Sequence, residues 1–284
     1  IFPKPIDSDR EKINNPDYIL ISHGHEDHLH EESLRCLSKN AKIFYPYTWV
    51  DDSKHYFKEM GFNNINEVKN WSTIEISDKI NLTYIQNRLN SIIVIEFGSI
   101  VIVNINDALH AGNKGIIDYY CKKILERWKN IDYVFCGFGG ASYFPNCFHL
   151  PQKKDKDIAE AREIYFLNNF FTIISKLEPQ TAIPFAADIA LLHPDIRWIN
   201  ETRINRELMK DYYSSIYPNS QTTIVTMYPG DTLSGHTIIS ESPYRVKFID
   251  SSLQHLIKEQ YSKEIENIEQ KPPLPLQNAN LLLE

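Results

Sequence analysis

A run of imidazole and carboxylate side chains near the start of the chain, in "YILISHGHEDHLHEESL" (residues 18–34), has the composition of a metal site. Residues 18–22 form a short, continuous apolar run, which predicts a buried strand. His23 and His25 follow it two residues apart, and in an extended segment such side chains point the same way, so both imidazoles can bind one metal ion. Asp27 and His28 come where the chain turns into a helix, and they can face a second, adjacent position.

Imidazole and carboxylate groups suit zinc, iron or manganese. Two such ions about 3.5–4 Å apart can share a hydroxide or activate dioxygen. The alternative is a solvated histidine-rich loop, or residues that cap a helix. Clustered histidines behind a buried strand serve no packing need, and buried polar groups cost free energy unless they are paired. The pattern therefore predicts two divalent metal ions.

The elements that must position this cluster belong to an α/β fold. Residues 67–107 are rich in strand patterns, with a hairpin signal at Phe97-Gly98. Helical patterns occupy 31–39, 49–60, 115–130, 153–177, 205–216 and 253–267, and further strands are expected at 42–45, in "DYVFCGF" and in "TAIPFA". Two strand-rich blocks with helices between and after them predict a sandwich with the sheets inside and the helices outside. We expect one domain, residues 1–284, with an extended, proline-containing tail at about 271–284.

Composition narrows the classes of partner. The net charge of −7 argues against non-specific nucleic-acid binding, which needs a basic face. No apolar run approaches the roughly 18–20 residues of a membrane span. The four cysteines are scattered without a Cys-x-x-Cys pair, which favours a reducing, cytoplasmic setting. We expect a small-molecule substrate, no nucleic acid and no membrane.

The stretch "ISHGHEDH" matches the His-x-His-x-Asp-His signature of the metallo-β-lactamase superfamily. The resemblance implies an αβ/βα sandwich with two metal ions at one edge of the two sheets. Three later segments, "VFCGFGGASYFPNCF", "LEPQTAIPFAADIALLHPD" and "TMYPGDTL", resemble the metallo-β-lactamase part of the CMP-N-acetylneuraminate hydroxylase family. The likeness runs from about Asp17 to Leu233.

The chain departs from the superfamily pattern in two places. Only 22 residues precede His23, so we expect the fold to lack its first N-terminal strands or to be trimmed of them. The usual third histidine, on a strand between the cluster and the next aspartate, is absent. The segment "LTYIQNRLNSIIVIEF" offers only Gln86, Asn87 and Asn90 in its place.

The resemblance also implies roles for later residues. Asp107, which ends "SIVIVNIND", corresponds to an aspartate that bridges the two metals, and the alternative is a helix cap or turn. His110 can supply the missing imidazole if its loop folds back, and a surface position is the alternative. The late metal ligand is either His193 or Asp188, although helix capping explains an aspartate there equally well. The candidate catalytic residues are Asp27, His30 beside the cluster, and His110.

The glycine-rich loop "GFGGASYF" lacks the lysine of a phosphate-binding P-loop. We expect it to line the substrate pocket, with Tyr143 and Phe144 as wall residues and Ser142 as a hydrogen-bond donor. Simple turn formation is the alternative.

Three functions compete. The resemblance favours a non-haem iron hydroxylase or oxygenase, with one iron ion or a di-iron pair, acting on a polar small molecule such as a sugar nucleotide. "CFH" at 147–149 is half of a Rieske motif, and no later cysteine completes it. Such an activity therefore needs a separate electron donor, or a metal pair that takes electrons from a reductant or from the substrate. The alternative is a zinc hydrolase that cleaves an ester, lactone, amide or phosphodiester. The third is a binding relative with reduced catalysis, which the complete "HGHEDH" run argues against.

Overall fold

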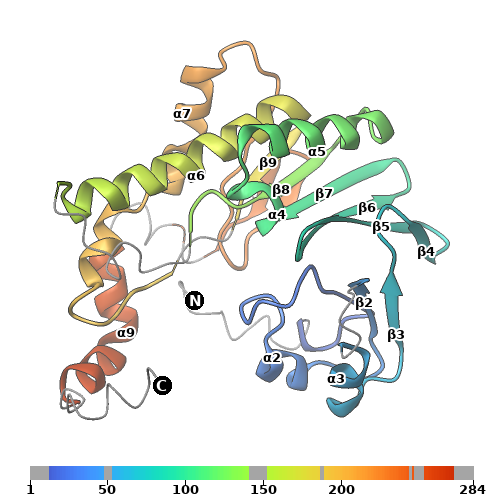
Figure 1. Ribbon diagram of the computed structural model, residues 1–284, viewed down its shortest axis with the longest axis horizontal. Helices are drawn as coiled ribbons and strands as arrows, with labels where there is room; N and C mark the ends of the chain where they lie inside the picture. The colour runs from blue at the N-terminus through green and yellow to red at the C-terminus, as the bar shows by residue number, and fades with distance from the viewer. Residues whose placement is uncertain are drawn as a thin grey trace.

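The computed structural model of the chain describes residues 13–47, 53–140, 152–185, 189–242, 245 and 253–271 (Figure 1). The strands are β1 (Tyr18–Leu20), β2 (Lys42–Pro46), β3 (Ile65–Val68), β4 (Thr73–Ser77), β5 (Ile80–Asn87), β6 (Asn90–Phe97), β7 (Ile100–Asn106), β8 (Tyr133–Cys136), β9 (Thr181–Pro184), β10 (Thr223–Ile224), β11 (Thr232–Ser234) and β12 (Thr237–Ser240). The α-helices are α2 (Glu31–Cys36), α3 (Ser53–Glu59), α4 (Asp107–His110), α5 (Lys114–Arg127), α6 (Asp155–Leu177), α7 (Met209–Ile216) and α9 (Leu253–Glu269), and two 3-10 helices are η2 (Arg197–Thr202) and η3 (Arg206–Leu208).

The strands form two main sheets. The smaller sheet has the parallel order β1-β2-β3. The larger sheet has the order β10-β9-β8-β7-β6-β5-β4, antiparallel from β4 to β7 and parallel from β7 to β10. The hairpin expected at Phe97-Gly98 joins β6 to β7, and Gly98 supplies the positive φ of 59° that the turn requires.

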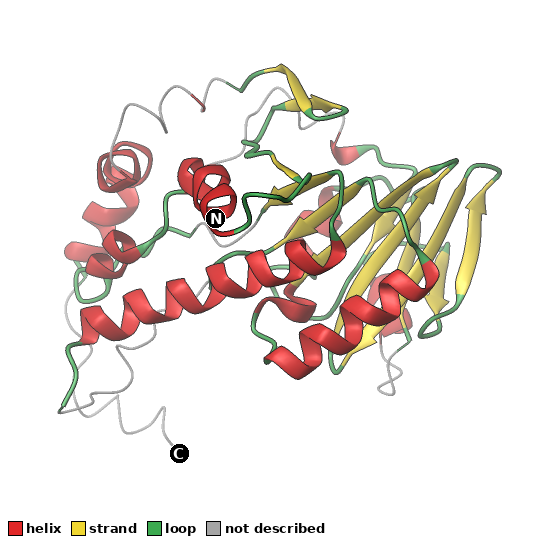
Figure 2. Cartoon of the chain, turned by 90° about the horizontal axis from the view of Figure 1, so that it is seen from above, coloured by secondary structure: helices red, strands yellow, loops and turns green. Residues whose placement is uncertain are grey.

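Successive side chains along a strand pack into different layers of the fold. On β2, Ile43 and Tyr45 pack with Phe57 of α3, whereas Phe44 between them packs with Tyr84 of the larger sheet. The opposite face of the larger sheet is covered by α5 and α6, which run across it (Figures 1 and 2). The order of layers is therefore helix, sheet, sheet, helix, and the predicted αβ/βα sandwich is confirmed.

Two differences from the expected elements have local causes. The helical pattern at 205–216 is divided, because η3 has 3-10 geometry before α7 begins at Met209. The strand β3 begins at Ile65, ahead of the strand-rich block expected from residue 67, and it is stabilised by parallel pairing with β2. A pairing between segments separated in sequence leaves no periodic signal in a four-residue strand. No helix among the described residues is long and apolar enough to cross a membrane.

Candidate metal centre

The cluster predicted from the first motif forms directly after β1. His28 and Leu29 donate backbone hydrogen bonds to the carbonyl of His25, at 2.9 and 2.7 Å. This tight turn reverses the chain before α2 begins, and it brings His28 back against His23, with the two ring centroids 4.1 Å apart. Two residues that are five apart in sequence thus present their imidazoles side by side.

Asp107 comes to the same place from the other sheet, since it follows the last residue of β7 and begins α4. His23, His25 and Asp107 form a first group whose nitrogen and carboxylate atoms all lie within 4.8 Å of one another. His23 Nε2 is 3.0 Å from His25 Nδ1 and 3.8 Å from Asp107 Oδ2. The group is made of two imidazoles and one carboxylate.

A second group is made of Asp27, His28 and the same Asp107. His28 Nε2 is 3.2 Å from Asp107 Oδ2 and 3.7 Å from Asp27 Oδ2. The Asp27 side chain is 58% exposed, whereas that of His23 in the first group is 1% exposed. The second group therefore opens to water through Asp27, whereas in the first group His23 is buried and His25 is exposed.

The backbone before Asp107 is held in an unusual conformation. Asn106 has φ 40° and ψ −127°, a region that non-glycine residues rarely occupy. Its side chain accepts from the Asp107 N–H at 2.6 Å and donates to the Ser91 carbonyl at 2.6 Å. These hydrogen bonds hold the sharp turn that directs Asp107 at the histidines. The sequence analysis missed Asn106, whose only signal was a polar residue in the last position of a buried strand.

Ser22 is a second residue that the sequence analysis missed. Its Oγ lies 3.0 Å from His23 Nδ1 and 3.4 Å from His28 Nδ1. Both imidazoles therefore direct Nε2 toward Asp107, while Ser22 contacts their other nitrogens. Hydrogen bonds of this kind set the tautomer and the ring orientation of metal-binding histidines. Its place immediately before the first histidine was the available signal.

The electrostatics of the two groups differ. Burial and the neighbouring His28 lower the pKa of His23 to about 4, so this imidazole is neutral at pH 7. For His28, burial acts in the same direction, but the hydrogen bond and the charge of Asp107 outweigh it and raise the pKa above 6.5. Burial favours a protonated Asp107, yet contact with His28 and the charges of His110 and His23 hold the carboxyl pKa below its usual value. Asp107 is thus a carboxylate, ready to bind a cation.

The separations between these atoms fit metal ions. Nitrogen and oxygen ligands that bind one ion at about 2.0–2.2 Å lie roughly 2.8–3.6 Å apart in tetrahedral or octahedral geometry. The distances of 3.0 Å between His23 and His25 and 3.2 Å between His28 and Asp107 fall within that range. The distances of 3.7 Å between His28 and Asp27 and 3.8 Å between His23 and Asp107 exceed that range slightly. The residues can hold two divalent ions, with Asp107 between them.

The other predicted histidines take different positions. His110 donates from Nδ1 to the Asp107 carbonyl, 2.9 Å away, and stacks on Phe166, so it lies beside the groups without belonging to either. His30 is the N-cap of α2 and accepts from the Ser33 N–H, which assigns it to capping rather than to the cluster. His193 is outside both groups, and its side chain is 55% exposed and faces Asp195 at 3.6 Å.

Four further predicted residues, Ser142, Tyr143, Phe144 and Asp188, lie outside the described residues, as does the tail from 272. The metal groups do border a described pocket of about 410 Å³, lined by His25, Asp107 and the turn 87–90 among others. A pocket of that size suits a small-molecule ligand, for which roughly 300–1,000 Å³ is usual.

Comparison with known proteins agrees with this architecture. The model of a β-lactamase superfamily domain matches residues 1–163. The cytidine monophosphate-N-acetylneuraminic acid hydroxylase of Danio rerio is 24% identical over 210 residues, which are 68% of this chain and 33% of the relative. The hydroxylase of the same name from Mus musculus is 25% identical over 235 residues, 78% of this chain and 39% of the relative.

Two further similarities cover comparable shares of this chain. A Mycobacterium tuberculosis protein named for a Rieske 2Fe-2S iron–sulfur centre is 23% identical over 214 residues, 70% of this chain and 40% of its own length. The solved structure of a mutant CmlA beta-hydroxylase superposes with a TM-score of 0.51 at 16% identity, over 76% of this chain and 44% of that one. The chain thus spans a third to two fifths of the curated relatives. With the family model matching more than half of the residues and the sandwich fold in place, the chain belongs to the metallo-β-lactamase superfamily.

Proposed function

We propose that this chain is the metal-binding part of a non-haem iron hydroxylase that acts on a polar small molecule, such as a sugar nucleotide. The observation that supports the proposal most strongly is the composition of the first group. His23, His25 and Asp107 provide two imidazoles and one carboxylate. This ligand set, with open coordination positions, is typical of non-haem iron(II) oxygenases.

The second group extends the proposal to a pair of iron ions. Asp27 and His28 share Asp107 with the first group, so that one carboxylate contacts both positions. When bound, the iron pair supplies dioxygen activation. The chain itself orients two imidazoles through Ser22 and turns Asp107 inward through Asn106. His110 donates from Nδ1 to the Asp107 carbonyl, which keeps it beside the centre as a candidate catalytic residue.

The names of the curated relatives support oxygen chemistry, because two of them are hydroxylases. The match covers 33% and 39% of their lengths, and under this proposal a separate donor supplies the electrons for the reaction. A separate iron–sulfur donor fits, since another relative is named for a Rieske 2Fe-2S centre. The substrate suggested by those names is a cytidine monophosphate sugar.

A zinc-dependent hydrolase is the second candidate, and the exposure of the second group favours it. Asp27 is 58% exposed, so water reaches the position that Asp27 and His28 form. Zinc accepts the same imidazole and carboxylate ligands, and it lowers the pKa of bound water to about 7. Such an ion would supply the chemistry for hydrolysis of an ester, lactone, amide or phosphodiester. A binding relative with little catalysis is the outcome if neither chemistry is observed.

The metal and the reaction are tested together. Protein purified without oxygen is analysed for metals by mass spectrometry, then loaded with iron or with zinc. Oxygen uptake is followed with ascorbate, a redox mediator and CMP-N-acetylneuraminate, and hydrolysis is followed on ester and lactone panels. The proposal expects iron in the purified protein and substrate-dependent oxygen uptake that the Asp107→Ala variant lacks. If the zinc-loaded protein hydrolyses a substrate and the iron-loaded protein takes up no oxygen, the zinc hydrolase replaces the proposed hydroxylase.

A further inference from the structure

The pocket of about 410 Å³ beside the metal groups has two walls, formed by segments that are separate in sequence. One is the tight turn of residues 87–90 between β5 and β6. The other is the segment 111–113, between α4 and α5, with Tyr165 of α6 behind it. His25 and Asp107 form part of the lining, so a molecule bound there touches the candidate metal centre directly.

Arg88, on the first wall, is the one positively charged residue among those that line this pocket. It is exposed, and the structure shows no carboxylate within ion-pair distance of it in the described part of the chain. Most other arginines of the described residues are engaged, as Arg35 is by Glu31 at 2.6 Å. The guanidinium of Arg88, at the edge of the pocket that borders the metal groups, is therefore available to a ligand.

The turn that carries Arg88 is tied to the metal centre on both sides. The Asn87 side chain donates to the Ala108 carbonyl at 2.6 Å, and the Asn90 side chain donates to the Asp107 carbonyl at 3.2 Å. Both acceptors belong to the segment that presents Asp107 to the histidines. The backbone of Arg88 is consequently held at a set position relative to the shared carboxylate, which places its side chain beside the pocket.

The backbone of Arg88 is also unusual. Its φ is 57°, close to the 59° of Gly98 at the next hairpin turn of the same sheet. Glycine occupies this region without strain, whereas a residue with a Cβ does so at an energetic cost. An arginine in a position that favours glycine, at the turn that borders the pocket, is consistent with selection for its side chain.

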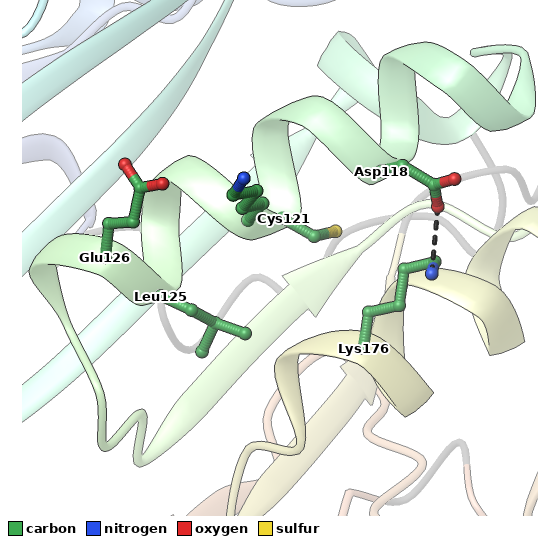
Figure 3. Close-up of a pocket in the computed structure, with 6 residues that line it drawn as sticks. Asp118, Cys121, Leu125, Glu126 and Lys176 are labelled. Carbon is green, nitrogen blue, oxygen red and sulfur yellow. Dashed lines mark ion pairs between the residues drawn. The ribbon is translucent and has the colours of Figure 1, made fainter.

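A second hollow, of about 430 Å³, lies between α5 and α6, away from the metal groups (Figure 3). Two of its charges are engaged with each other, since Lys176 reaches from α6 to Asp118 of α5 at 2.8 Å. The thiol of Cys121 there is buried, and burial raises its pKa to about 12, which leaves it unreactive. This hollow offers no reactive nucleophile and has no residue of the metal groups in its lining, so the pocket beside Asp107 is the stronger candidate for substrate.

We propose that Arg88 determines substrate specificity by binding an oxyanion group, a carboxylate or a phosphate, of the molecule whose reacting atom lies at the metal centre. The fork of a guanidinium donates two parallel hydrogen bonds to such a group. The proposal deepens the proposed function, since it assumes that the His25–Asp107 region is the reaction centre, but it is the same for oxidation and for hydrolysis.

The test is binding of two probes to metal-loaded protein by calorimetry, without turnover. CMP carries a phosphate and no carboxylate, and N-acetylneuraminate carries a carboxylate and no phosphate. Arg88→Met should weaken at least one probe by roughly tenfold or more, because hydrogen bonds to charged groups contribute strongly. Arg88→Lys, which retains the charge but not the fork, should fall between. The probe that is weakened identifies the anionic group.

Lys122→Met is the matched control, because it removes one positive charge from the wall of the other hollow. Its affinities should equal those of the wild type. Equal loss in Lys122→Met and Arg88→Met would show a general charge effect and overturn the proposal. So would unchanged affinities in Arg88→Met, or a wild-type protein that binds neither probe. None of these results depends on oxygen uptake or hydrolysis, so failure here is distinct from failure of the proposed function.

Discussion

The Nε2 atom of His28 lies 3.2 Å from the Oδ2 atom of Asp107, although the two residues belong to segments that follow strands of different sheets. The same oxygen lies 3.8 Å from Nε2 of His23. One carboxylate oxygen thus faces an imidazole from each of the two groups. This relationship joins the sheets at the site, and it makes Asp107 the residue on which both metal positions depend.

Replacement of Asp107 by alanine should remove both metal ions rather than one. Each group has three ligands, and the loss of the shared carboxylate leaves two imidazoles in one and an exposed Asp27 with His28 in the other. Metal content measured by mass spectrometry should fall well below one ion per chain. Asp211→Asn, an exposed carboxylate on α7, serves as the control and should retain full content. Retention of one ion at full occupancy in Asp107→Ala would contradict a shared ligand.

Ser22→Ala should weaken metal binding while leaving all ligands in place. Ser22 contacts Nδ1 of both His23 and His28, and loss of such outer hydrogen bonds typically lowers affinity by about 10–100-fold. Competition with a chelator measures the change. Ser33→Ala is a matched control, because Ser33 makes the same kind of contact to His30, outside the cluster, at 2.9 Å. Equal affinities in the two variants would count against the orienting role of Ser22.

Acidification should remove the ion of the second group before the ion of the first group. A proton and a metal ion compete for the same imidazole nitrogen. The pKa of His28 is raised above 6.5, so its position weakens as the pH falls toward and through that value. The pKa of His23 is lowered to about 4, so the first position persists in the same range. Metal content after dialysis between pH 8 and pH 4.5 should fall by one ion, while the ion of the first group is retained. A single step that removes both ions together would be inconsistent with this order.

Asn106→Gly should be more stable than Asn106→Ala, the reverse of the usual ranking. Both variants lose the side-chain hydrogen bonds to Asp107 and Ser91, a loss of about 1–3 kcal/mol for buried groups. Only alanine keeps the strain of φ 40° and ψ −127°, which costs about 1–3 kcal/mol. Urea unfolding of the metal-free proteins measures the difference directly. An alanine variant at least as stable as the glycine variant would show that the backbone relaxes there.

The metal cluster could be predicted because its residues are adjacent in sequence and their directions follow from strand and turn geometry. Asp107 could be predicted only through resemblance, since the contact with His28 depends on how two sheets pack. For His30 the motif fitted both a place beside the cluster and a helix cap, and the contact with Ser33 that makes it the cap of α2 is a local one. Arg88 and Asn106 were missed because their distinguishing feature is a backbone conformation, which residue type and spacing do not reveal.

Anomalous diffraction at the iron edge, from crystals grown without oxygen, tests the central claim most directly. The account predicts two iron peaks, one contacted by His23 and His25 and the other by Asp27 and His28, with Asp107 bound to both. A single peak, or two peaks of which Asp107 contacts only one, would contradict it.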